Sequence, residues 1–441
     1  MQAAMLAPTL VPLLAIFAEH FTAPSFVTFQ HVVAGWILCL DRHTVTGVLR
    51  ASGAVGQKHH TCFHRFFRVA AWCPMAVGLC LARMVIGLVT EDQPIIVPLD
   101  DTLGRHTGKH IRGASMHHDP LLSTRKKPVF HWGHVWVVLS IHIRIPIWNK
   151  GFALPVFAEL YRSEKLCDKE GRAFFKKTEL AAKLIALLAK AFPERWFCVV
   201  ADAAYANASI IRTLPSNVHF IGRSRLDAAL YAPPKRQRMG RPRVKGERVP
   251  SPAARARASG WQRLTIGVYG KHVTVQVKVF DALWYVVGGG RMMRFVLIRG
   301  WPGHEKDDVL CTTDLGLDAR QMIECYCLRW TIEVTFESTK GRLGFEDPQN
   351  RGERAVERTA PMALWIYSLT VVWYLTIGCK LRSARMPQYP WYSKNVPAFS
   401  DMLAALRREA WRSRLLDPAH GNSGAQKSLE PLLDAVAYAA G

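Results

Sequence analysis

The stretch RWFCVVADAAY, residues 195–205, leaves few options for the fold around it. Its unbroken apolar run ends at Asp202, and such a run is typical of a strand buried on both faces of a sheet. Residues 178–192 before it predict a long helix, and residues 131–145 and 151–160 predict two earlier strands. Strands that alternate with helices indicate an α/β layered domain.

A second apolar run, PIIVPL at 94–99, also ends in acidic residues, Asp100 and Asp101. Carboxylates that meet at strand ends suit two-metal phosphoryl transfer, because oxygen ligands bind a hard cation such as Mg²⁺. A single aspartate in such a position is more often a helix N-cap or a loop residue. The two strand ends therefore predict a metal site only if a third acidic group joins them.

Residues 326–340, YCLRWTIEVTFESTK, supply a candidate for that third group. On a single α-helix, the side chains of Tyr326, Arg329, Glu333, Glu337 and Lys340 would share a face about 80° wide. A solvated face of ion pairs is the ordinary alternative, but Glu333 and Glu337 are like charges one turn apart, which costs stability there. Arginine, lysine and tyrosine can instead hold DNA phosphates beside a carboxylate that binds metal.

The spacing Tyr326-x2-Arg329-x3-Glu333-x6-Lys340 resembles the YREK signature of bacterial insertion-sequence transposases, which are DDE enzymes with a ribonuclease H-like fold. LDDT at 99–102 and VVADAAY at 199–205 resemble the first and second aspartate motifs of that family. The β-rich region between the second aspartate and the glutamate also matches this branch. The resemblance covers roughly residues 94–379.

By this resemblance, Asp100, Asp202 and Glu333 are the catalytic residues and hold two Mg²⁺ or Mn²⁺ ions. Tyr326, Arg329 and Lys340 would contact DNA phosphate near the cleaved end. Asp101 stays open as an alternative first ligand, although Asp100 alone keeps the Asp-x-Thr spacing to Thr102.

The resemblance implies a DNA transposase that cleaves transposon ends and transfers the freed strand into target DNA. It also implies a homodimer in the synaptic complex and a cytoplasmic, nucleoid-associated location in a bacterium. The alternatives are a nuclease of similar fold without strand transfer, an inactive transposase-derived DNA-binding protein, and a basic membrane protein.

The charge of the chain agrees with a nucleic-acid partner. The 441 residues carry a net charge of +24, and the common reason for such an excess is a polyanionic partner.

The ten cysteines are scattered without a CxxC pair, which predicts buried free thiols in a reducing compartment. Residues 359–379 carry no charge and are long enough to span a bilayer, but such a helix also suits a large core, which we expect here.

Together these observations predict an α/β fold, a ribonuclease H-like mixed sheet flanked by helices, with a β-rich insertion and a helical N-terminal domain. The predicted N-terminal domain at 1–90 is helical and DNA-binding, and the first part of the catalytic domain follows at 91–222. A β-rich insertion with a basic loop occupies 223–315. The C-terminal part of the catalytic domain, with the signature helix, lies at 316–380, and a C-terminal helical tail lies at 381–441. Within the insertion, residues 233–260 hold nine Lys or Arg against one Glu and predict a flexible loop.

Two weaker patterns leave alternatives open. Residues 44–68 predict two helices, which form either a helix-turn-helix or an ordinary αα-hairpin. The histidines after the first aspartate include His106 and His110 at a zinc-like spacing, but no cysteine pair accompanies them. We expect the segment HTGKHIRG at 106–113 to contact DNA backbone or to lie on the surface.

Overall fold

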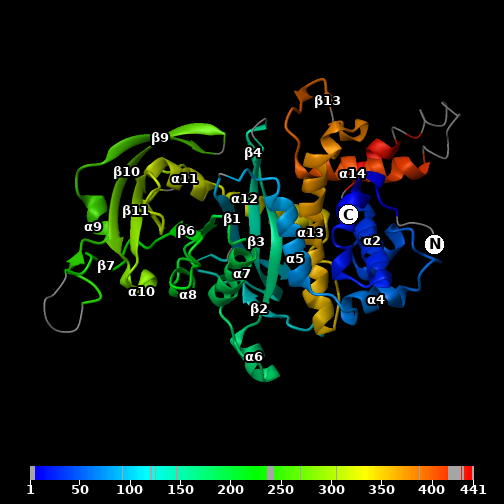
Figure 1. Cartoon of the computed structure of the whole chain (residues 1–441), viewed down its shortest axis with the longest axis horizontal. Helices are drawn as coiled ribbons and strands as arrows, with labels where there is room; N and C mark the ends of the chain where they lie inside the picture. Colours follow the sequence, from blue (N-terminus) through cyan, green and yellow to red (C-terminus); the bar gives the residue numbers. More distant parts are fainter. Residues whose placement is uncertain are drawn as a thin grey trace.

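Five strands of the computed structural model pair in the order β4-β3-β1-β5-β6. They are β1 (Ile95–Arg105), β3 (Phe130–Ile145), β4 (Lys150–Tyr161), β5 (Phe197–Ala201) and β6 (Val218–Arg223). The labelled β1, β3 and β4 lie in the middle of the molecule (Figure 1). β3 is antiparallel to β1 and β4, whereas β5 is parallel to β1 and β6. The structure describes residues 5–415 except 92, 120–121, 125, 146–147, 236–242, 269, 304 and 387, and also residues 429 and 432–439.

Pro98 lies inside β1, a central strand, where proline usually removes a hydrogen bond of the ladder. Its cross-strand neighbour is Val200 of β5. The antiparallel register with β3 begins one residue later, where Leu99 pairs with Leu139. The missing N–H of Pro98 therefore costs β1 no bond to β3.

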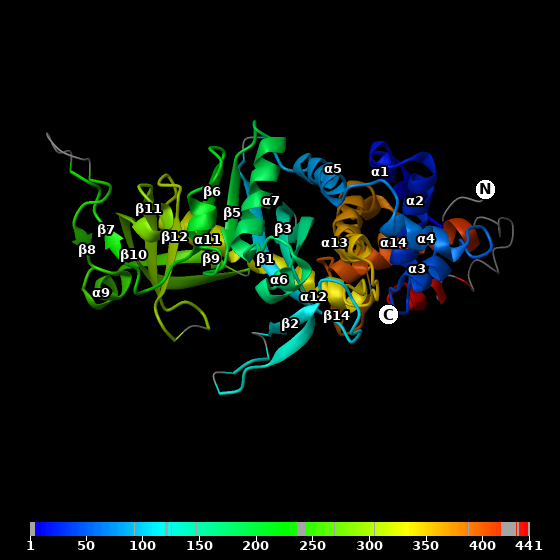
Figure 2. The same ribbon diagram turned by 90° about the horizontal axis from the view of Figure 1, so that it is seen from below.

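The predicted insertion continues the central sheet instead of forming a sheet of its own. β12 (Asp308–Thr312) pairs with β6, and the sheet then runs outward through further strands to make twelve in the described residues. These strands are β11 (Met292–Arg299), β10 (Lys271–Leu283), β7 (Leu230–Tyr231) and β8 (Arg248–Val249), with β9 (Gln262–Val268) paired to β10. Figure 2 shows this lobe and the N-terminal helices at opposite ends of the molecule.

The prediction of a flexible loop over 233–260 is wrong for its second half. Residues 248–249 form β8, and α9 (Pro252–Arg257) follows. The Ser251 hydroxyl accepts a hydrogen bond from the N–H of Ala254, Pro252 occupies the first turn, and Ala256 is buried, so the local sequence starts a helix despite its charge. The more basic residues 236–242 lie outside the described part of the chain.

Helices cover both faces of the central strands. α7 (Lys177–Ala191) packs on β3 and β4, and α12 (Trp330–Arg342) packs on β1 and β4. α11 (Ala319–Cys327) lies against β9 and β6. Shorter helices and a strand complete this part: α6 (Glu164–Glu170), α8 (Ala208–Ile211), α10 (Tyr285–Gly288) and β2 (Ser115–His118).

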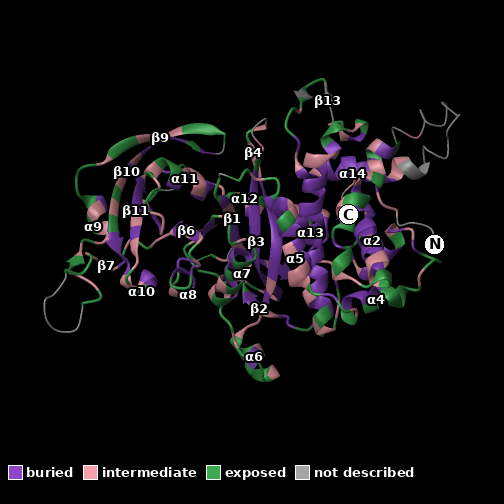
Figure 3. Ribbon diagram, in the orientation of Figure 1, coloured by how far each residue is buried: buried purple, intermediate pink, exposed green. Residues whose placement is uncertain are grey.

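The uncharged stretch at 359–379 belongs mostly to α13 (Glu353–Thr376), which packs against β4, α4, α5 and α14. Nearly all of its side chains are buried, as Figure 3 shows. In the described part of the chain, no helix is both long and apolar enough to cross a membrane. The prediction that this helix belongs to the core is therefore confirmed.

The chain begins with helices that pack on the far side of α13. They are α1 (Val11–Ala15), α2 (Ala23–Leu38), α3 (Val45–Ala51), α4 (His60–Arg68) and α5 (Pro74–Ile86). α4 turns three phenylalanines inward, Phe63, Phe66 and Phe67, and leaves its histidines and arginines exposed. After α13 come the short hairpin of β13 (Gln388–Tyr389) and β14 (Tyr392–Ser393), and then α14 (Phe399–Leu415).

All ten cysteines are free thiols, as predicted, but not all of them are buried. Cys62, Cys73 and Cys379 are exposed. Cys62 lies on the outer face of α4, and Cys73 and Cys379 lie beside helix ends, where apolar surroundings in the sequence do not guarantee burial.

Candidate active site

Asp100 and Asp202 lie at matching positions on neighbouring parallel strands. Leu99 of β1 pairs with Ala201 of β5, and each aspartate is the next residue of the chain. β5 ends at Ala201 as predicted, but the prediction that the other strand ends at Asp100 is wrong, because β1 continues to Arg105 in its pairing with β3. Burial raises the pKa of the Asp100 carboxyl to about 7, the charges of Asp101 and Asp202 add to the rise, and the Arg329 guanidinium opposes it. Buried negative charge of this kind is typical of a site that a cation completes.

Asp101, the alternative first ligand, already has two partners. Its carboxylate accepts a hydrogen bond of 2.8 Å from the Tyr205 hydroxyl and lies 2.6 Å from the Lys177 ammonium. Because successive side chains of a strand point to opposite faces, Asp101 ties β1 to α7 and to the loop after β5 while Asp100 faces the other way. The geometry thus gives Asp101 a structural role.

Arg329 connects Asp100 to Glu333. Its Nη1 lies 3.0 Å from Asp100 Oδ2 and its Nη2 lies 2.7 Å from Glu333 Oε1. The side chains of Arg329 and Asp100 are only 14% and 18% exposed, whereas that of Glu333 is 34% exposed. The three groups therefore form a partly buried network that joins β1 to the start of α12.

Tyr326 lies beneath this network and does not face outward. Its ring is buried edge-on to Trp301, and the guanidinium groups of Arg329 and Arg223 each lie 5.9 Å from its centroid. Cations over an aromatic ring are attracted to it, so Tyr326 helps to position Arg329.

The prediction of one continuous helix over 326–340 is wrong. α11 ends at Cys327 and α12 begins at Trp330. Between them the N–H groups of Arg329 and Ile332 bond to carbonyls three residues earlier, so the chain turns more tightly than an α-helix. The Thr331 hydroxyl also donates to the Leu328 carbonyl at 2.6 Å, which competes with the normal α-helical bond.

Lys340 reaches the backbone of β1 near Asp100. Its Nζ donates 2.7 Å to the Leu103 carbonyl and lies 3.7 Å from Glu346. Glu337, three residues before Lys340, is exposed and makes no ion pair or hydrogen bond in the described residues, so it does not orient this lysine. Lys340 donates to this partly buried carbonyl and has Glu346 as its acidic partner.

The acidic residues fit divalent cations in type. All three offer carboxylate oxygens, which Mg²⁺ and Mn²⁺ prefer, and Asp100 gathers further negative charge around it. As arranged, however, no group of three His, Cys, Asp or Glu side chains within the described ranges is placed to hold a metal ion. A cation shared by Asp100 and Glu333 would take the place that the Arg329 guanidinium occupies.

The histidines after β1 form a structural cluster. The rings of His106 and His134 meet at 3.0 Å, and His134 also bonds to the Arg112 carbonyl at 2.8 Å. Burial lowers the pKa of His106 to about 4 and that of His134 to about 3. His131 lies 3.0 Å from Asp119, while His110 and His118 are exposed. The expectation that residues 106–113 lie on the surface or contact DNA is therefore wrong for His106, whose ring packs against His134.

Sequence reasoning missed three residues that hold the site together: Lys177, Tyr205 and Glu346. Tyr205 stands three residues after Asp202 in a segment that the sequence had singled out, so its position was a usable signal. Lys177 and Glu346 lie far from the motifs along the chain, and nothing in their local sequence indicates their partners.

Comparisons with known proteins found a family model and solved structures that match the chain. A family model described as "DDE superfamily endonuclease" matches residues 16–278, well over half of the 441 residues. The match includes Asp100 and Asp202 and ends before Glu333. No curated protein matches the chain. Among solved structures, the cryo-EM structure of a piggyBac transposase synaptic complex with hairpin DNA is similar at 9% identity and a TM-score of 0.44, covering 98% of this chain and 82% of that one.

Proposed function

Since this chain belongs to the DDE superfamily endonucleases, we propose that it is a DNA transposase that cuts transposon ends and joins the freed strand to target DNA. The observation that carries the proposal is the arrangement of three acids. Asp202 directly follows β5, Asp100 lies at the matching position within β1, and Arg329 ties Glu333 to Asp100.

The fold supports a ribonuclease H-like catalytic domain. Its strands β4-β3-β1-β5-β6 form a mixed sheet of antiparallel and parallel pairs with helices packed on it, as the resemblance implies. The Tyr-Arg-Glu-Lys spacing supports the bacterial insertion-sequence branch. Transposon-end and target DNA are then the partners, and a homodimer would align two ends.

In this proposal Asp100, Asp202 and Glu333 hold two divalent cations. Such cations activate the attacking oxygen and stabilise the leaving oxygen of a phosphodiester. Asp100 must lose its proton to act as a ligand, and its pKa of about 7 places that event near neutral pH. Arg329 would exchange its carboxylate partners for a DNA phosphate, while Lys340 keeps α12 fixed to β1.

The test uses duplexes that carry the DNA flanking the reading frame in its native genome, including the terminal repeats. With Mg²⁺, the wild-type protein should nick at the repeat boundary and form joined products with target DNA. Asp100→Asn and Asp202→Asn should bind the same duplex and yield neither product. Cleavage without joined products would instead indicate a nuclease, and full cleavage by both variants would refute the proposed site.

A further inference from the structure

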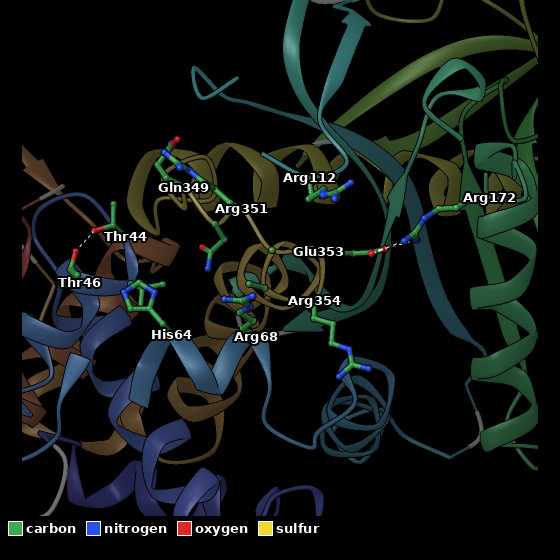
Figure 4. A pocket seen from close by; sticks show the side chains of 14 residues that line it. Thr44, Thr46, His64, Arg68, Arg112, Arg172, Gln349, Arg351, Glu353 and Arg354 are labelled. Atoms are coloured by element: carbon green, nitrogen blue, oxygen red, sulfur yellow. Dashed lines mark hydrogen bonds and ion pairs between the residues drawn. The ribbon is translucent and has the colours of Figure 1, made fainter. Parts of the chain in front are cut away.

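A basic groove of about 1050 Å³ lies between the N-terminal helices and the loop that leads into α13. Figure 4 shows residues of α3 and α4 on one side and residues 349–354 on the other, with Arg112 and Arg172 at one end. Five arginines line the groove, and Glu353 is its only acidic residue among those the structure describes there.

Three of these arginines have no partner in the described part of the chain. Arg172 is paired with Glu353 at 2.6 Å and Arg112 with Glu170 at 3.4 Å. In contrast, Arg68, Arg351 and Arg354 are exposed and make no ion pair or hydrogen bond there. Clustered unpaired cations repel one another, and a bound polyanion removes that cost.

The groove also offers hydrogen-bonding groups that are not charged. Asn350 lines it, and its Oδ1 is buried without a hydrogen-bond partner among the described residues. Gln349 and Thr46 lie on its two sides. Phosphates of a DNA strand would pair with the arginines, and the N–H groups of the Gln349 and Asn350 amides and the Thr46 hydroxyl can donate hydrogen bonds to the same phosphates.

The groove is joined firmly to the candidate active site. The loop after α12 receives a 2.8 Å hydrogen bond from Trp36 Nε1 to the Leu343 carbonyl and another from the His43 N–H to Asp347. On its other side, Glu346 accepts from the N–H of Arg105 at the end of β1. The same loop therefore connects the helix that carries Glu333, the strand that carries Asp100, and the N-terminal unit.

From these observations we propose that the groove binds the sugar–phosphate backbone of the transposon-end duplex beyond the cleavage point, through Arg68, Arg351 and Arg354. This inference rests on the proposed function and adds a specific DNA contact to it. The N-terminal helices and the catalytic domain then hold one strand jointly, so end binding and active-site assembly depend on the same loop.

The experiment compares two triple variants of the full-length protein. In one, Arg68, Arg351 and Arg354 become Ala, and in the control the exposed Arg83, Arg320 and Arg382 outside the groove become Ala. Both lose three charges. Binding of a fluorescent end duplex is measured in EDTA over a range of salt, and circular dichroism checks that each variant is folded.

The groove variant should bind at least about tenfold more weakly at 0.1 M salt, and its log–log salt slope should be about 3 units shallower than that of the wild type. The control should change the slope by less than about 1 unit. Equal slopes for the two variants would overturn the inference. Binding is measured without metal and is therefore separate from cleavage. Normal binding by an inactive groove variant would count against the groove inference. Cleavage by Asp100→Asn would instead count against the proposed function.

Discussion

Arg329 and Asp100 form an ion pair of 3.0 Å between residues that are 229 positions apart in the chain. The same guanidinium lies 2.7 Å from Glu333. An arginine thus neutralises two of the three acids proposed to bind metal. Cation binding and this ion pair compete for the same carboxylates, and the first prediction follows from that competition.

Arg329→Gln should bind Mn²⁺ more tightly than the wild type in the absence of DNA, by about tenfold. The change frees two carboxylates and removes a positive charge from the site, which corresponds to about 1.4 kcal/mol at that ratio. Calorimetry or Mn²⁺ paramagnetic resonance measures the dissociation constant. Arg320→Gln, on the exposed first turn of α11, is the control and should leave it unchanged. Weaker Mn²⁺ binding by Arg329→Gln would mean that the arginine supports the metal site.

Asp100 should make the unfolding free energy depend on pH. Its pKa is about 7 in the folded protein and about 3.9 in an unfolded chain, so the folded state binds the extra proton between these values. Stability from this group is therefore complete below about pH 4 and is lost as the pH rises through 7. The loss should be on the order of 2–4 kcal/mol.

Urea unfolding in EDTA at pH 4 to 8 measures this dependence. Asp100→Asn should flatten it, so the variant gains stability relative to the wild type as the pH rises. Asp168→Asn, on the exposed surface of α6, serves as a control that keeps the wild-type profile. Parallel profiles for the wild type and Asp100→Asn would contradict the raised pKa of the Asp100 carboxyl.

Asp101→Asn should separate the two candidates for the first metal ligand. Asp101 holds Lys177 and the buried Tyr205, so its loss should lower the unfolding free energy by about 1–3 kcal/mol. Cleavage of an end duplex by the folded fraction should fall far less than with Asp100→Asn. If Asp101→Asn is the inactive enzyme and Asp100→Asn cleaves, the ligand assignment is wrong by one residue.

Glu333→Gln should reduce end cleavage by about a thousandfold or more, since it removes a charge that holds the cation while it keeps the side-chain shape. DNA affinity should stay the same or increase as repulsion of phosphate falls. Glu337→Gln is a matched control one turn away, on an exposed position, and should cleave within a few-fold of the wild type. Single-turnover rates and binding curves in Mg²⁺ distinguish the two variants.

Leu369→Arg should destabilise the protein by several kcal/mol, because Leu369 is 2% exposed in α13 and an unpaired charge would be buried there. Val55→Arg is the control, since Val55 is 62% exposed. The midpoints of urea unfolding give the comparison. Equal midpoints would mean that α13 is not packed into the core in solution.

The sequence by itself determined the elements whose burial leaves a regular pattern. β5 could be predicted because a strand covered on both faces contains no polar residue until it leaves the sheet at Asp202. The helix at 177–191 and the strands β3 and β4 followed from apolar periodicity in the same way. Each of these signals is local, so the chain itself carries it.

Only the tertiary structure decided which side chains meet. The turn between α11 and α12 depends on bonds of Arg329, Ile332 and Thr331 that helical periodicity does not reveal. Lys340 contacts Glu346 and the Leu103 carbonyl of β1 instead of Glu337. A partly buried acceptor on another element stabilises the lysine more than a nearby carboxylate exposed to water. The arginine groove arises where residues near 68 and 350 are brought together, and no local pattern records contacts across such a separation.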